Sequence, residues 1–345
     1  MGSNDSTRIL SDFIKKVEEI DFDKLPISDY NKQYIANLKP AITYYTEIYR
    51  RALIRALTLF PTKKEEAIAV DYGGGCGLFS IFMKLYGINK VIYVDMNPAS
   101  VHTIKELGKV FGVLPDAIIC GDSPELVTWS RKNKIKPNLI IGLDVIEHIY
   151  NLRHFFKDIV SLNKDISLVF MTGSNPMNAW KCRKLRKEMD AYEKGNAVTP
   201  NYYTKRLEFI KQIHPDMEEE KAHEYAAATR GMNYPDIRYF IQSHNWNGTG
   251  AATETNFRDK NNTCDPETGN YMERILPLNE YSHYMSDRED GILFINVGFY
   301  NTFVKNRLKR WGAKLANFLI LHTGTLGIRI APFIIISSVR NRTRK

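Results

Sequence analysis

Five short apolar runs alternate with helix-like segments between residues 67 and 173. The runs are 67–72, 90–96, 116–122, 138–144 and 166–173. Each run is continuously apolar, which is typical of strands that are buried on both faces of a parallel sheet. In the segment between the second and third runs, Asn97 is a predicted helix cap and Pro98 stands in the first turn. The pattern predicts an α/β fold whose mostly parallel sheet has helices on both faces.

Two regions make up the predicted first half of the chain. Residues 1–65 are a predicted N-terminal helical cap, because apolar side chains recur at helical spacing between Ile42 and Leu57 and Pro61 follows them. Residues 66–175 are the predicted Rossmann-like core.

Two further regions follow the fifth run. Residues 176–287 are predicted to be a largely helical insertion that can cover one end of the sheet, with a long loop of turn-forming residues at 243–270. Residues 288–345 are predicted to add strands at 291–300 and 331–339, with a basic helix at 302–322 between them. With these two strands, the predicted sheet has seven strands.

A glycine-rich turn, VDYGGGCGLFS at 70–80, follows the first predicted strand. Glycine permits positive φ and a close approach to the backbone, and ligands of open parallel sheets bind outside the carboxyl ends of the strands. The spacing is not the G-x-G-x-x-G of dinucleotide-binding enzymes, because the sixth position is Leu78. The pattern that holds is D-x-G-x-G-x-G, formed by Asp71, Gly73, Gly75 and Gly77.

This turn and the acidic residues at the ends of the next three runs resemble class I S-adenosylmethionine-dependent methyltransferases. In that family the glycine turn passes under the methionine and ribose part of the cofactor. An acid after the second strand binds the ribose hydroxyls, one after the third contacts the adenine, and one after the fourth lies beside the methyl group. The resemblance covers 66–175 well and 288–340 more weakly. It implies that S-adenosyl-L-methionine is bound by Asp71, Gly73, Gly75, Gly77, Asp95, Met96, Asp122, Ser123 and Asp144.

The segment DVIEH at 144–148 resembles E-x-x-E-H of the ubiquinone-type O-methyltransferases and of many glycan-cluster methyltransferases, with Asp144 in place of their first Glu. The segment GIRIAPFIIISSVRN is loosely similar to methyltransferases of polysaccharide and lipid-linked sugar pathways. The resemblance implies methyl transfer to a hydroxyl or amine of a small molecule, with a sugar or lipid-linked glycan as acceptor, and a role in glycan biosynthesis. Two alternatives are an RNA methyltransferase and a non-catalytic scaffold that keeps the fold.

The proton of an acceptor hydroxyl has to be removed, and the pKa of histidine suits a general base. The candidates are His148, just past the fourth predicted strand, and His244, in the long loop. A metal-assisted path is the alternative. Asp144, Glu147 and His148 combine oxygen ligands with one imidazole, as magnesium or manganese would accept. The sequence leaves the metal-free and metal-assisted paths open.

Positive charge gathers at the C-terminal end of the chain. Residues 301–345 carry ten of the 48 Lys and Arg and none of the 39 Asp and Glu, which leaves 38 basic and 39 acidic residues elsewhere. The helix at 302–322 is therefore a candidate contact for an anionic membrane, and without a basic stripe elsewhere no nucleic-acid partner is expected. The four cysteines show no paired spacing, so a cytoplasmic protein is expected. The basic C-terminal end adds the expectation that it lies peripherally at a membrane.

Overall fold

A computed structural model describes residues 3–59, 63–196, 199–243, 262–285 and 291–340. Contacts between residues divide the chain into two compact units. Unit 1 consists of Met1–Val145, Arg153–Gly173 and Ser282–Lys345, and unit 2 consists of Ile146–Leu152 and Ser174–Tyr281.

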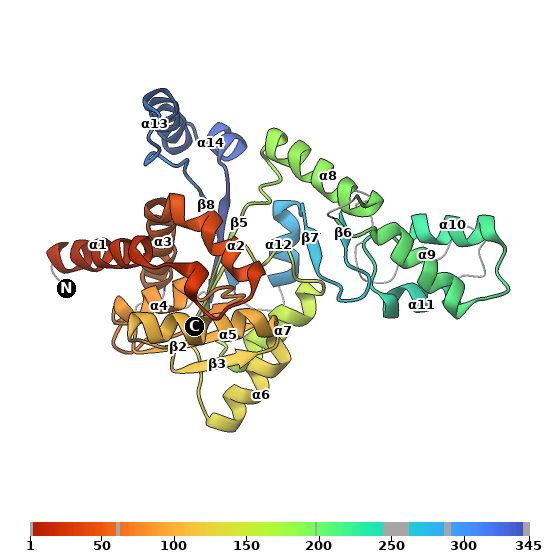
Figure 1. Ribbon diagram of the computed structural model, residues 1–345, viewed down its shortest axis with the longest axis horizontal. Helices are drawn as coiled ribbons and strands as arrows, with labels where there is room; N and C mark the ends of the chain where they lie inside the picture. Colours follow the sequence, from red (N-terminus) through yellow and green to blue (C-terminus); the bar gives the residue numbers. More distant parts are fainter. Residues whose placement is uncertain (1–2, 60–62, 197–198, 244–261, 286–290, 341–345) are drawn as a thin grey trace. The chain divides into compact units, whose positions relative to one another are not determined.

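Unit 1 contains a seven-stranded sheet with the order β3-β2-β1-β4-β5-β9-β8 (Figure 1). The first five strands pair in parallel, and β9 pairs antiparallel with both β5 and β8. This confirms the predicted Rossmann-like, mostly parallel sheet. The strands are β1 (Ile68–Tyr72), β2 (Lys90–Asp95), β3 (Ala117–Cys120), β4 (Leu139–Leu143), β5 (Ser167–Thr172), β8 (Gly291–Val297) and β9 (Ile334–Arg340).

Helices cover both faces of the sheet. On one face the N-terminal helices pack against the helix that follows the glycine turn, where the rings of Phe13 and Phe82 lie 5.4 Å apart. On the other face Phe155 packs against Phe170 of β5 at 5.7 Å. The helices of the first face are α1 (Ser3–Glu19), α2 (Asp29–Leu38), α3 (Ile42–Leu59), α4 (Leu78–Leu85) and α5 (Pro98–Phe111). Those that follow β3 and β4 are α6 (Ser123–Asn133) and α7 (Leu152–Leu162).

The expected helix boundaries are partly confirmed. Asn97 caps α5, and its Oδ1 accepts the Ala99 N–H at 3.0 Å. The basic helix α13 (Arg307–His322) begins five residues later than predicted, because Asn306 caps it through the N–H of Lys309 at 3.0 Å. A short helix, α14 (Thr325–Ile330), connects it to β9.

Unit 2 is mostly helical, with α8 (Ala179–Lys194), α9 (Tyr202–Ile213), α10 (Glu219–Ala228) and α11 (Tyr234–Ser243), while α12 (Leu278–Met285) begins at its end. It also contains a two-stranded antiparallel sheet of β6 (Thr263–Cys264) and β7 (Tyr271–Glu273). Most of the predicted loop at 243–270, namely 244–261, lies outside the described residues, and in its described part β6 forms a short strand where a loop was expected. Two strands of two and three residues are too short to give a recognisable alternation in the sequence.

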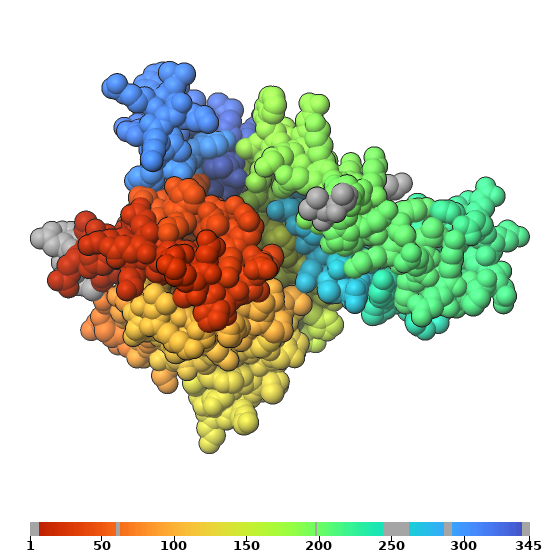
Figure 2. All heavy atoms as spheres, in the orientation of Figure 1, coloured from red at the N-terminus to blue at the C-terminus, as the bar shows by residue number. Residues whose placement is uncertain are grey.

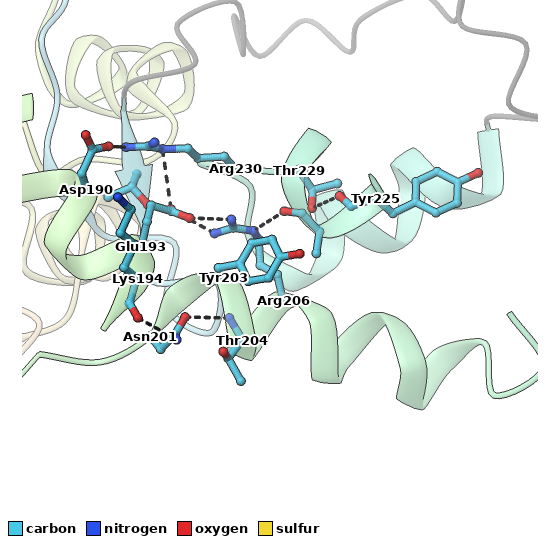
Figure 3. A network of polar contacts seen from close by, with 12 residues as sticks. Asp190, Glu193, Lys194, Asn201, Tyr203, Thr204, Arg206, Tyr225, Thr229 and Arg230 are labelled. Carbon is cyan, nitrogen blue, oxygen red and sulfur yellow. Dashed lines mark hydrogen bonds and ion pairs between the residues drawn. The ribbon is translucent and has the colours of Figure 1, made fainter. Parts of the chain in front are cut away.

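A buried ion pair connects the helices of unit 2 (Figure 3). Arg206 of α9 is 1% exposed, and its two terminal nitrogens lie 3.1 and 2.6 Å from the carboxylate oxygens of Glu193 in α8. Its Nε donates to the Ala226 carbonyl of α10 at 3.0 Å. The hydroxyl of Thr263 in β6 also donates to Glu193. One guanidinium–carboxylate pair therefore ties three helices and a strand together.

Candidate functional site

The glycine-rich turn is fastened to the neighbouring strand β2. The N–H groups of Gly73 and Gly74 donate to the Val94 carbonyl at 2.8 and 3.1 Å. The hydroxyl of Tyr93 donates to the Gly75 carbonyl at 2.5 Å, and a Cβ at Gly74 would come within 2.6 Å of the Tyr93 ring. The turn therefore has a fixed course at the carboxyl ends of β1 and β2.

The glycines of the turn differ in how much space a Cβ atom would have at each position. Gly73 (φ +67°) has no room for a Cβ, which would lie 2.3 Å from Val145 Cγ2. A Cβ at Gly77 (φ +86°) would lie 2.1 Å from Ile104 Cδ1. At Gly75 (φ +53°) the nearest atom to a Cβ would be the Tyr34 hydroxyl oxygen, 3.9 Å away. Gly75 is thus the glycine of the three that leaves space for a ligand to approach the backbone.

Asp95 ends β2, as predicted, and its carboxylate binds the turn directly. Oδ2 accepts the N–H of Gly75 at 2.8 Å, and Oδ1 accepts the N–H of Asn97 at 2.8 Å. Burial raises the pKa of the Asp95 carboxyl, while these two hydrogen bonds favour its ionised form. Each oxygen keeps a further lone pair that can accept a hydroxyl. Met96, the next residue, is 50% exposed and offers an apolar contact beside it.

Asp71 lies beneath the turn, with its side chain buried. The hydroxyl of Ser80 in α4 donates to its Oδ2 at 2.7 Å, and a Cβ at Gly74 would lie 2.9 Å from the same oxygen. Burial raises the pKa of Asp71 to about 7. Asp71, a predicted cofactor residue, therefore lies where its buried side chain supports the glycine turn.

Asp71 should make stability depend on pH. Because its folded pKa of about 7 exceeds the ordinary 3.8, the folded state holds the proton more tightly. The contribution of Asp71 to the free energy of unfolding is fully present below about pH 4 and is lost as the pH rises through about 7. We expect Asp71→Asn to flatten the fall in the free energy of unfolding across this interval, measured by urea denaturation at a series of pH values. A slope equal to that of the wild type would contradict the assignment, and Asp12→Asn, at an exposed position of α1, is the control.

Asp122 was expected at the end of the third strand, but β3 ends two residues earlier, at Cys120. Asp122 is instead the N-cap of α6, where its Oδ1 accepts the Ser123 N–H at 2.7 Å and Glu125 accepts the Asp122 N–H at 2.9 Å. The hydroxyl of Tyr72 also donates to Asp122. The Ser123 hydroxyl donates to Asp158 at 2.7 Å. Both side chains thus support the local helix start, at the carboxyl edge of the sheet.

Asp144 follows β4 directly and is exposed. Its φ of +52° is uncommon for a residue other than glycine, and such backbone strain gathers at functional sites. Its N–H donates to the Met171 carbonyl at 2.9 Å, and its Oδ1 accepts the N–H of Gly173 at 3.1 Å. These bonds to β5 and its end hold the carboxylate at the same edge of the sheet as Asp95.

Sequence reasoning missed Tyr34 of α2, whose hydroxyl lies beside Gly75. Partial burial raises the pKa of its phenol, and the nearby Cys76 and Asp144 contribute in the same direction. Burial and then Asp144 also raise the pKa of Tyr45 in α3. The N-terminal helices therefore bring two phenols toward the turn and Asp144. No local pattern in the sequence connects position 34 with position 75, so tertiary packing alone reveals this.

Unit 2 holds the other candidates. Glu147 is buried, and His148 Nδ1 lies 2.8 Å from the Tyr271 carbonyl oxygen. A carbonyl can only accept, so Nδ1 is the donor in this hydrogen bond, which leaves Nε2 as the ring nitrogen for other partners. His244 lies outside the described residues. Among the residues that are described, no group of three or more His, Cys, Asp or Glu is placed to hold a metal ion, so Asp144, Glu147 and His148 do not form one.

Residues 45–214 match a family model described as a methyltransferase domain. Among solved structures, the plantazolicin methyltransferase BpumL in complex with SAH is similar with 12% identity and a TM-score of 0.41, over 99% of this chain and 100% of that one. A ribosomal protein L11 methylase from Lactobacillus delbrueckii subsp. bulgaricus is similar with 18% identity and a TM-score of 0.30, over 42% of this chain and 66% of that one. No curated protein matches the sequence.

Proposed function

We propose that this chain, whose residues 45–214 match a family model described as a methyltransferase domain, is a class I S-adenosylmethionine-dependent methyltransferase that methylates a hydroxyl of a small molecule, with a sugar or lipid-linked glycan as the leading acceptor class. The observation that carries the proposal is the site at the carboxyl edge of the parallel sheet. There, an approachable Gly75 backbone lies against the carboxylate of Asp95, and Asp144 follows the neighbouring strand β4. An amine is the alternative acceptor group.

The residues of this edge suit S-adenosylmethionine by their chemistry. Asp95 would accept the two ribose hydroxyls, because a carboxylate can accept several hydrogen bonds at once. The open side of Gly75 would admit the cofactor close to the backbone, and the exposed Met96 would contact the adenine. Asp144 would place negative charge near the sulfonium. Since a sulfonium is a good leaving group, positioning supplies much of the rate enhancement.

An acceptor hydroxyl also needs a base, and we assign His148 this role. Its Nδ1 is engaged by the Tyr271 carbonyl, which leaves Nε2 as the nitrogen that can take a proton.

We further propose that the insertion at 176–287 supplies the acceptor site. It follows the carboxyl end of β5, the edge of the sheet at which ligands of parallel sheets bind. Trp180 and Tyr239 are 86% and 57% exposed, and such rings can stack on a sugar. Transfer of a labelled methyl group to glycan extracts, small metabolites and RNA would identify the acceptor class, and labelling of RNA alone would contradict the proposal.

Asp95→Ala should weaken S-adenosylmethionine binding by about 1.5–3 kcal/mol, the range for a hydrogen bond to a charged group. Isothermal titration calorimetry measures the loss. The matched control is Asp116→Ala, because Asp116 also accepts a backbone N–H, that of Val91 at 2.8 Å, but before β3 begins. Equal affinity in the wild type and Asp95→Ala would remove Asp95 from the site. An equal loss in both variants would indicate a general effect on the fold.

A further inference from the structure

Helix α13 presents an apolar stripe to solvent. Leu308, Trp311, Leu315 and Phe318 recur at helical spacing, and they are 83%, 68%, 46% and 57% exposed. In a globular protein such a stripe normally faces the core. Here Ile320 is the residue that α13 buries, and the helix stands clear of the sheet that its unit is built on (Figure 1).

The orientation of this stripe is fixed by contacts on other sides of the helix. Asn317 accepts the N–H of Tyr300 at 2.6 Å and donates to its carbonyl at 3.0 Å. A Cβ at Gly327 of α14 would lie 2.2 Å from the Ile320 carbonyl, so α14 packs closely on this part of α13. The helix therefore holds its stripe outward through specific bonds and close packing.

Basic side chains surround the stripe, and no acidic residue lies anywhere in 301–345. Within the described part of the chain, none of these cations takes part in an ion pair. Figure 2 shows this C-terminal region, in blue, on the outer surface. The exposed cations are Lys305, Arg307, Lys309, Arg310 and Lys314.

We propose that this face of α13 docks on an anionic lipid bilayer, with the helix lying in the plane of the interface. Leucine, tryptophan and phenylalanine side chains would enter the boundary between headgroups and acyl chains, while the cations meet lipid phosphates. Among the described helices, none could span a bilayer.

The chemistry of the face favours a bilayer over two other occupants. Nucleic acid would use the cations and would leave Leu308, Leu315 and Phe318 exposed to water. A second copy of this chain would bring two positive faces together, which disfavours association. A bilayer can contact the apolar stripe through its acyl chains and the cations through its phosphates at the same time.

Flotation with vesicles tests the proposal. We expect binding to vesicles of phosphatidylcholine with phosphatidylglycerol, weak binding to phosphatidylcholine alone, and weakening as salt rises. Lys309→Gln combined with Lys314→Gln should lower the partition coefficient about fivefold per cation. Trp311→Ser combined with Phe318→Ser should lower it at least about tenfold. Tyr30→Ser on α2, with 64% exposure, is the matched aromatic control and should bind as the wild type does.

Three results would overturn the proposal. One is equal binding to both kinds of vesicle at every salt concentration. Another is RNA binding that both double variants lose while vesicle binding stays unchanged. The third is dimerisation without vesicles that Trp311→Ser and Phe318→Ser abolish. Circular dichroism and S-adenosylmethionine affinity, unchanged in each variant, show that the fold is intact.

Discussion

Arg206→Ala is expected to lower the free energy of unfolding of unit 2 by about 3–5 kcal/mol, because it leaves the buried carboxylate of Glu193 without its main partner. The substitution also removes the hydrogen bond that Arg206 Nε donates to the Ala226 carbonyl, so this carbonyl loses that donor. Urea denaturation, followed by circular dichroism, measures the change.

Two controls separate the charge from the packing. The combination of Arg206→Met with Glu193→Leu removes both charges and should recover much of the loss, because apolar pairs of similar volume often replace buried ion pairs. Lys184→Ala breaks an exposed pair with Glu188 at 3.5 Å and should cost less than about 1 kcal/mol. A loss for Arg206→Ala as small as that for Lys184→Ala would show that the buried pair contributes little.

His148→Ala is expected to lower turnover about 10²–10⁴-fold, the usual range for a general base. S-adenosylmethionine affinity should stay unchanged, because the proposed cofactor residues belong to unit 1. Single-turnover transfer with the identified acceptor measures the effect. His148→Gln keeps a side chain that can donate to the Tyr271 carbonyl, and it should be as inactive as the alanine variant if proton removal is the role.

His154→Ala is the control, since His154 is an exposed histidine on α7, six residues further along the chain. A loss under about tenfold for His148→Ala would assign the proton to another group. The assays are run with and without a chelator. Loss of activity in the wild type on chelation would favour the metal-assisted path.

The core of the fold was predictable because its strands are buried on both faces. Burial on both faces gives continuous apolar runs, and the five runs between 67 and 173 correspond to β1 to β5. Asp95 was predictable for a local reason: it is the last residue of β2 and lies next to the turn after β1 in a parallel register.

Other features were hidden because they depend on contacts between distant residues or on ambiguous local signals. Asp122 ends the third apolar run, and D-S-P-E also encodes a helix cap, which the structure shows at the start of α6. Tyr34 reaches Gly75 only through the packing of α2. The outward face of α13 has the spacing of a buried helix, so periodicity alone could not show that it faces solvent.

The attachment of the glycine turn to β2 has a consequence for how fast a ligand is captured. The Tyr93 hydroxyl and ring, the Val94 carbonyl and the Asp95 carboxylate fix the turn through bonds that exist before any ligand arrives. A loop that is already ordered loses little conformational entropy on binding. Association is then not delayed by a folding step at this turn, and the binding energy of the ligand remains available for orienting its methyl group.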